Sequence, residues 1–318
     1  MMNFLLAFLV LFSATQATAG PIRISYSALA PIMVGLWVAD DIGGFKKNGL
    51  DTQLIYIPSA ATNVQALLGG SIEIGTPGAS GAVLSAARGA PVVSIGSLMN
   101  RPPMTLYVQP EISKVESLKG QTLGITRFNS SAHLVAVLVL RKLGLEKAVT
   151  LRPMGGVPEM QAAFEQRQIA GMFTSLKPRP RANALLNAAD LDIPYAINVI
   201  AATRDYLRAH PDIVTKVLRA YVEGVAAMVQ DKERTTKVLE RYLRRSEPSA
   251  LEEMYVLAKT YTERVPRVDP RIIPTILEFG DLKDANPEAV AAAAIDNSFV
   301  DNLVKEKFIE KVFGEKAR

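Results

Sequence analysis

After Gly20, segments with the hydrophobic pattern of a strand take turns along the chain with segments that have the pattern of a helix, and this order predicts an α/β protein. Short apolar or alternating runs predict strands, and apolar residues repeating every three to four positions predict helices. The expected strands are 22–27, 54–57, 72–74, 92–95, 106–108, 123–126, 150–152, 171–174 and 193–202. The expected helices are 31–40, 59–68, 79–88, 131–143 and 159–167.

Beyond residue 202 the pattern is almost wholly helical, with one apolar stripe from Val214 to Val229. A polar connector over 111–119 separates two series of strands and helices. Two such series followed by a helical tail predict two lobes, the first of which is split and completed by the C-terminal part.

The N-terminus has the pattern of a secretory signal peptide. Residues 4–12 form an apolar run that is too short to span a bilayer, and Ala17-Thr18-Ala19 precedes Gly20 as a small-x-small cleavage site. We therefore expect residues 1–19 to be removed on export. The segment before the apolar run has no Lys or Arg, so a buried N-terminal strand or an uncleaved anchor stays open as an alternative.

The amino-acid composition excludes several classes of functional site. Among its 318 residues the chain has no Cys and only two His, His133 and His210. Disulfide scaffolds, thiolate metal sites and Cys nucleophiles are therefore excluded, and a His-rich zinc site is not expected. No cofactor is expected.

The loops at the carboxyl ends of the expected strands are where an open α/β sheet binds its ligand. Within the loops 27–33, 76–81, 97–103, 126–131, 153–159 and 174–181 the only acidic residue is Glu159. The basic residues there are Arg101, Arg127, Lys177, Arg179 and Arg181. Helices that begin near 77–80, 129–131 and 155–156 would add their N-terminal N–H groups, which favour an anion. The alternative is that these loops are simply polar and solvated.

Three further side chains are candidates for the site, but each also has an ordinary structural interpretation. Ser59 is expected to cap the helix that follows it. Trp37, the sole tryptophan, lies on an apolar helix, where packing in the core and stacking on a ligand are both open. His133, two residues inside a helix start, is expected to be a packed or solvated residue.

Four ordered motifs resemble those of one protein family. Residues 38–51, VADDIGGFKKNGLD, resemble the A-x-x-x-G-x-F-K-K-x-G-L-D signature of solute-binding proteins of the nitrate/sulfonate/taurine importer family, which includes relatives that bind thiamine precursors. Residues 66–75, 86–91 and 118–125 resemble three further segments of that family.

This resemblance implies a type II periplasmic binding protein fold: two Rossmann-like lobes, two crossover strands near 106–108 and 193–202, and a helical C-terminal part. The implied lobes are 20–107 with 197–318, and 108–196. The implied ligand-binding residues are Ser27, Ala28, Thr76, Gly78, Ala79, Ser80, Asn100, Thr126, Asn129, Ser130, Ser131, Gly155, Gly156, Thr174 and Ser175. Residues 169–178 lack the Asp that the family often has before the Pro, so the family's substrates do not transfer to this chain.

The expected function is therefore that of a periplasmic, monomeric solute-binding component of an ABC importer. It would close on a small organic anion, with Arg101 or Arg127 as the charge partner, and dock on a membrane permease without contacting nucleic acid. Three alternatives stay open: a ligand-sensing module for a membrane receptor, an exported enzyme on the same fold, and a binder of a heterocycle held by Trp37.

Overall fold

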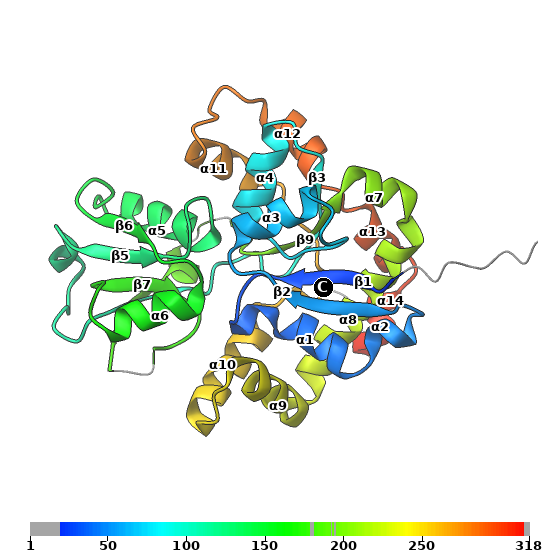
Figure 1. Cartoon of the computed structure of the whole chain (residues 1–318), viewed down its shortest axis with the longest axis horizontal. Helices are drawn as coiled ribbons and strands as arrows, with labels where there is room; N and C mark the ends of the chain where they lie inside the picture. Colours follow the sequence, from blue (N-terminus) through cyan, green and yellow to red (C-terminus); the bar gives the residue numbers. More distant parts are fainter. Residues whose placement is uncertain (1–19, 179–180, 192, 194, 315–318) are drawn as a thin grey trace, which may run out of the picture.

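The computed structural model describes residues 20–178, 181–191, 193 and 195–314, and shows two groups of strands, each flanked by helices (Figure 1). The expected signal peptide, residues 1–19, lies outside the described residues, as does Arg179. No helix within the described ranges is long and apolar enough to cross a membrane.

The first sheet is assembled from two strand pairs. β1 (Ile22–Tyr26) runs parallel to β2 (Thr52–Tyr56), and β3 (Val92–Ser97) runs antiparallel to β9 (Val199–Thr203). Residues 74 and 75, at the end of an expected strand, join the pairs through bridges from Ile24 to Ile74 and from Gly75 to Ala201. The carboxyl ends of β1 and β2 therefore lie beside the segment that enters β9.

The second sheet has five strands in the order β6-β5-β7-β4-β8. The strands are β4 (Thr105–Val108), β5 (Thr122–Ile125), β6 (Thr150–Pro153), β7 (Gly171–Thr174) and β8 (Asn183–Asn187). β5 is parallel to β6 and β7, whereas β4 is antiparallel to both β7 and β8.

Helices cover both sheets. Two α-helices flank the second sheet: α5 (Ser131–Lys142) and α6 (Val157–Glu165). Those of the first are α1 (Val34–Asp41), α2 (Gly44–Lys47), α3 (Ala60–Leu68), α4 (Ala79–Ala87), α7 (Arg204–Ala209), α8 (Pro211–Gln230), α9 (Lys232–Leu243), α10 (Pro248–Tyr261), α11 (Ile272–Phe279), α12 (Pro287–Ala294), α13 (Ser298–Lys305) and α14 (Phe308–Phe313). Three 3-10 helices cover Pro31–Met33, Val115–Leu118 and Ala188–Leu191.

The apolar stripe after His210 forms the buried face of α8, which packs against α1. The two helices approach closely because Gly224 has no side chain: a Cβ there would lie 2.5 Å from the Cβ of Ala39. This packing builds the core of the first lobe and holds the β1 end of the site in place.

Two segments connect the sheets, residues 98–104 and residues 188–198. The expected lobe boundary at 107/108 falls inside β4, which pairs only with strands of the second sheet. The division into lobes stays a prediction, and the strand pairing favours placing it in these two connecting segments.

Candidate functional site

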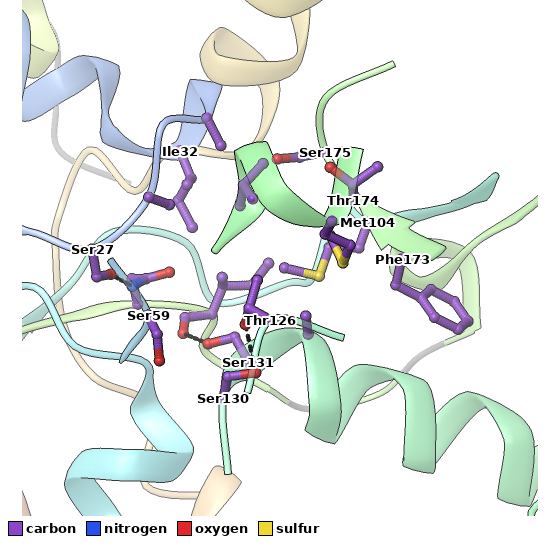
Figure 2. Close-up of a pocket in the computed structure, with 17 residues that line it drawn as sticks. Ser27, Ile32, Ser59, Met104, Thr126, Ser130, Ser131, Phe173, Thr174 and Ser175 are labelled. Atoms are coloured by element: carbon purple, nitrogen blue, oxygen red, sulfur yellow. Dashed lines mark hydrogen bonds between the residues drawn. The ribbon is translucent and has the colours of Figure 1, made fainter. Parts of the chain in front are cut away.

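A cavity of ≈ 510 Å³, which includes open solvent at its mouth, lies between the two lobes (Figure 2). The first lobe, together with the segment that enters β9, supplies Ser27, Ala28, Ala30, Ile32, Ser59, Ile197 and Asn198. The second lobe and its connector supply Met104, Thr126, Ser130, Ser131, Ala132, Val157, Met160, Phe173, Thr174 and Ser175.

The wall from the first lobe is held by a hydrogen-bonded group at the end of β1. The Ser27 Oγ donates to the Thr76 carbonyl oxygen at 2.7 Å, and the Asn198 Nδ2 donates to both Ser27 Oγ (2.9 Å) and that carbonyl (2.8 Å). These bonds join the carboxyl end of β1 to the connecting segment before β9 and hold this wall together.

Ser59 differs from the other hydroxyls of the cavity. It precedes α3 but its side chain makes no capping bond, contrary to the expected role, because its backbone adopts φ 73° and ψ 136°. That conformation is strained for a residue with a Cβ. The side chain is only 3% exposed, and its Oγ has no hydrogen-bond partner among the described residues. A buried hydroxyl without a partner costs free energy, and a bound ligand could supply the partner.

The wall from the second lobe is built at the start of α5. Ser130 caps the helix by accepting from the His133 N–H, and the Thr126 Oγ1 donates to Ser130 Oγ at 2.8 Å. Ser131 donates from its Oγ to the Ile197 carbonyl oxygen. This last bond ties the start of α5 to the connecting segment before β9, at the edge of the cavity.

Three helices begin at the cavity: α3 after Ser59, α5 after Ser130, and α6 at Val157. The first N–H groups of a helix have no partner within it and carry the positive end of its dipole. None of the described residues that line the cavity is charged. The cavity therefore offers hydroxyl groups and helix N-termini, a combination that favours an anion.

Of the residues expected at the site, seven line the cavity: Ser27, Ala28, Thr126, Ser130, Ser131, Thr174 and Ser175. Others lie just behind the walls. Thr76 accepts from Ser27 and Asn198, and the Ser80 Oγ donates to the Asn129 carbonyl oxygen across the lobes at 3.1 Å. Gly78, Ala79, Gly155 and Gly156 also do not line it.

Arg101 and Arg127, the expected charge partners, do not reach the cavity. Both are exposed, and the guanidinium of Arg101 lies over the ring of Tyr261 at 5.3 Å. Asn100 is held outside the site, where its backbone N–H donates to the Glu263 Oε1 at 3.1 Å. A position in a loop near the site does not decide where a long side chain points.

Trp37 lies in the core and not in the cavity. It is fully buried and stacks on Tyr242, with ring centroids 4.4 Å apart and an interplanar angle of 6°. Of its two open interpretations, packing is the one that this geometry supports.

The lining residues not expected from the sequence fall into two groups. The apolar ones, such as Met104, Phe173 and Ile197, are indistinguishable from core residues by pattern, and the ring of Phe173 turns away from the hydroxyl groups (Figure 2). The polar ones are Ser59 and Asn198. Ser59 follows an expected strand, so the rule that located Ser27 would also have located it. Asn198 lies within an expected strand, and nothing in the sequence pattern marked it as a site residue.

Within the described residues, no group of three or more His, Asp or Glu side chains could hold a metal ion. A family model described as NMT1/THI5 like matches residues 30–235. The chain belongs to this family. The match confirms the resemblance that the four motifs indicated. No curated protein matches the chain.

Solved structures resemble this NMT1/THI5-like chain over most of its length. The alkanesulfonate-binding protein SsuA from Xanthomonas axonopodis pv. citri, bound to MOPS, is 19% identical with a TM-score of 0.72, covering 87% of this chain and 100% of its own. The periplasmic nitrate-binding protein NrtA from Synechocystis PCC 6803 is 10% identical with a TM-score of 0.75, and the match covers 94% of this chain and 92% of NrtA. The desulfurization enzyme DSZB is 14% identical with a TM-score of 0.62, and the match covers 90% of this chain and 99% of DSZB. The expected periplasmic binding protein fold is confirmed.

Proposed function

We propose that this protein is the periplasmic solute-binding component of an ABC importer and that it captures a small organic anion, sulfonate- or carboxylate-like, between its lobes. The observation that carries the proposal is the cavity between the lobes, at which three helices begin and which hydroxyl groups line. In this proposal the protein is exported with loss of residues 1–19, acts as a monomer and delivers its solute to a membrane permease.

The comparisons support a binding role by analogy. Two of the similar proteins are named for an alkanesulfonate and for nitrate, both of which are anions. Because the enzyme DSZB has a similar fold, the fold alone does not exclude catalysis. The cavity itself favours binding: no His, Asp or Glu among the described residues lines it to activate one of its hydroxyl groups as a nucleophile.

The charge of the solute would be balanced by backbone groups and hydroxyls and not by an arginine. Hydrogen bonds to a charged group contribute about 1.5–3 kcal/mol each. The Ser59 Oγ is the best placed single donor, since it is buried and has no other partner among the described residues.

A thermal-shift screen tests this proposal, with sulfonates and carboxylates set against neutral and cationic solutes of similar size. Small organic anions are expected to raise the melting temperature, because a ligand that binds only the folded state stabilises it. Calorimetry with the best anion then compares variants. Ser59→Ala is expected to weaken binding about tenfold, since 1.4 kcal/mol is one decade in Kd.

Three control variants make the test specific. Ser71→Ala changes an exposed serine beyond the other end of α3 and is expected to leave Kd unchanged. Arg101→Ala and Arg127→Ala are expected to change Kd by less than about fivefold, the range of an exposed charge. If cations are the best ligands, or if an arginine variant loses binding and Ser59→Ala does not, the proposed mode of recognition is wrong.

A further inference from the structure

A second hollow, which we call the side pocket, adjoins the cavity. It has a volume of ≈ 680 Å³, open solvent included. Its lining comes from both lobes: Leu29, Leu243, Arg244 and Arg245 from the first, and Val157, Pro158, Gln161, Glu165 and Leu176 from the second. The function proposed above gives no role to Gln161 or to the charged residues of this pocket.

The side pocket continues from the cavity along α6. Val157 lines both spaces, and Gln161 lies four residues further on, so the two side chains share one face of the helix. One turn of an α-helix rises about 5.4 Å. A solute that lies against Val157 in the cavity therefore needs to extend by only about one helical turn to reach Gln161.

Gln161 has an unused hydrogen-bond acceptor. The side chain is only 7% exposed, and its Nε2 donates to the Leu176 carbonyl oxygen at 3.0 Å. This bond fixes the orientation of the amide, because the reversed amide would set two oxygens against each other. The Oε1 then has no hydrogen-bond partner among the described residues. A buried acceptor without a partner costs free energy, so the pocket favours a group that donates a hydrogen bond to it.

The charges around the side pocket are mainly basic. Arg245 is 7% exposed, and its Nη1 donates to the Lys177 carbonyl oxygen of the other lobe at 2.7 Å. Arg244 and Glu165, both exposed, are the other charged residues that line the pocket in the described part of the chain. Two guanidinium groups against one carboxylate disfavour a cation. The donor that suits Gln161 is therefore a neutral one, such as a hydroxyl group.

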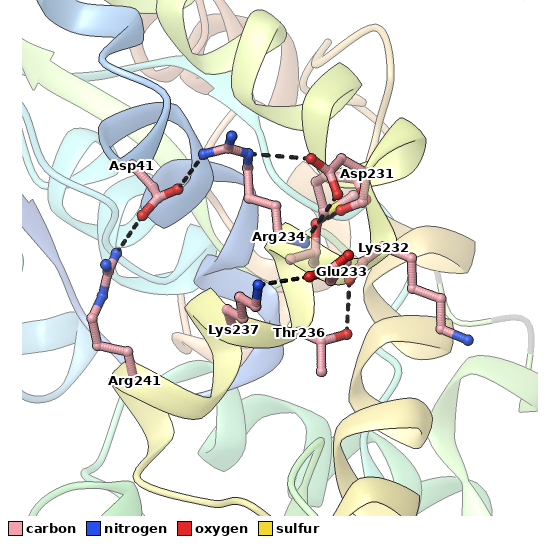
Figure 3. Close-up of polar contacts among 10 residues, drawn as sticks. Asp41, Asp231, Lys232, Glu233, Arg234, Thr236, Lys237 and Arg241 are labelled. Carbon is pink, nitrogen blue, oxygen red and sulfur yellow. Dashed lines mark hydrogen bonds and ion pairs between the residues drawn. The ribbon is translucent and has the colours of Figure 1, made fainter.

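The position of this basic wall is set by α9, at whose end it lies. Arg234 and Arg241 on that helix bond the two carboxylate oxygens of Asp41 on α1, each at 2.9 Å (Figure 3). Leu243 is the last residue of α9, and Arg244 follows it in the left-handed conformation, with φ 50°. The ion pairs hold α9 against α1, so the wall has a defined position against which a solute can bind.

We infer that the side pocket is a subsite for the uncharged end of the solute, and that the solute is an organic anion whose far end carries a neutral hydrogen-bond donor, such as a hydroxyl group, bound by Gln161. This inference rests on the proposed function and narrows its substrate class. The anionic end lies at the helix N-termini of the cavity, and the carbon chain passes Val157 to reach the Gln161 Oε1. A methyl group at the far end would leave that acceptor without a partner.

Calorimetry with sulfonates of similar length tests the inference on the unmodified protein. The probes 3-hydroxypropanesulfonate, butanesulfonate and 3-aminopropanesulfonate end in a hydroxyl, a methyl and an ammonium group, and 3-sulfopropanoate ends in a carboxylate. The hydroxyl and methyl compounds are also compared with chains one carbon shorter and one carbon longer. We expect the hydroxyl compound to bind about three- to tenfold more tightly than its methyl counterpart at the best length, the range of a neutral hydrogen bond. Equal binding of the two at all three lengths, or tightest binding of the ammonium or carboxylate compound, would overturn the inference while the anion site stands.

Gln161→Met is the informative variant, since it keeps the length of the side chain and removes the acceptor. It is expected to abolish the preference for the hydroxyl compound and to leave the Kd of butanesulfonate unchanged. Gln109→Met is the matched control: Gln109 is 6% exposed, its Nε2 donates to the carbonyl oxygens of Phe164 and Ile169, and it lines neither the cavity nor the side pocket. It is expected to retain the preference. A preference that survives in Gln161→Met would also overturn the inference, and the comparison on the unmodified protein decides the question even if this variant does not fold.

Failure of the proposed function gives a different result. If none of the sulfonates binds, pentanoate and 4-hydroxybutanoate repeat the comparison with a carboxylate as the anionic end. If these also fail to bind, the proposed function itself is wrong.

Discussion

Ser59 concentrates three costs in one residue: a strained backbone, a buried hydroxyl and no hydrogen-bond partner among the described residues. A positive φ at a residue with a Cβ costs of order 1–3 kcal/mol, and native proteins retain such strain mostly where it serves a site. Three other serines that line the cavity make side-chain hydrogen bonds within the protein: Ser27, Ser130 and Ser131. These three therefore shape the cavity, whereas in the proposed function the hydroxyl of Ser59 bonds the solute.

His133 makes folding stability depend on pH. Its Nδ1 accepts from the Asn129 N–H at 3.0 Å, and its ring lies against Phe128 and Phe279. Burial lowers the pKa of His133 from 6.5 to about 4. As pH falls from 6.5 toward 4, the unfolded chain takes up a proton that the folded chain does not, so the free energy of unfolding decreases in that window.

Urea unfolding at pH 7 and pH 5 measures this effect. We expect His133→Gln, which retains an acceptor for the Asn129 N–H, to lose less stability between the two pH values than the unmodified protein does. His210→Gln, which changes the chain's other histidine, serves as the control. Identical pH dependence in the unmodified protein and in His133→Gln would show that His133 does not contribute.

At the scale of elements, α5 holds the lobes together from one side of the cleft. The Arg141 Nη1 bonds the Glu278 Oε1 of α11 at 2.9 Å, and the Arg141 Nη2 bonds the Glu146 Oε1 of its own lobe at 2.8 Å. On another side, the Lys177 Nζ bonds the Glu253 Oε1 of α10 at 3.1 Å. All of these pairs are at least partly exposed, so each contributes about 0–1 kcal/mol.

The two partners of Arg141 allow a matched experiment. Glu278→Gln removes a pair that forms between the lobes, and Glu146→Gln removes one that forms within a lobe. We expect Glu278→Gln to raise the dissociation rate of the best anion about two- to threefold at low salt, and to have less effect at 1 M salt, where such pairs are screened. Stopped-flow measurements on both variants check this, and an equal effect of Glu146→Gln would exclude a role in closure.

Most elements could be predicted from the sequence because apolar periodicity marks the buried faces. The pattern located β5, β7 and the buried stripe of α8, and the seven lining residues that the resemblance implied lie in loops that the rule for strand ends marked. It missed β8, an edge strand whose ends are both Asn. It also could not show that residues 193–198 lie outside β9, since an apolar connecting segment resembles a buried strand.

The directions of long side chains were beyond prediction from the sequence. The excess of basic residues in the expected loops suggested an arginine as the charge partner, but Arg101 stacks on Tyr261 and Arg127 is exposed. Two of the three helix N-termini expected from the same loops, those of α5 and α6, do lie at the cavity, whereas that of α4 does not line it. Backbone direction follows from local patterns, whereas the course of a flexible side chain depends on tertiary neighbours.

At the scale of the whole molecule, the two lobes are in contact beside the cavity. Bonds from Ser80 to Asn129 and from Ser131 to Ile197 cross the cleft beside the cavity. In the proposed function the lobes move about a hinge, and the two connecting segments between the sheets are the places where such a hinge can bend. Binding and closure are therefore coupled in this account.

A crystal structure with the best anion from the screen tests the central claim most directly. The account predicts the anionic oxygens between the lobes, within about 2.7–3.2 Å of the Ser59 Oγ and of N–H groups at the starts of α3 or α5, with no arginine in contact. An anion held by Arg101 or Arg127, or bound outside the cleft, would contradict it.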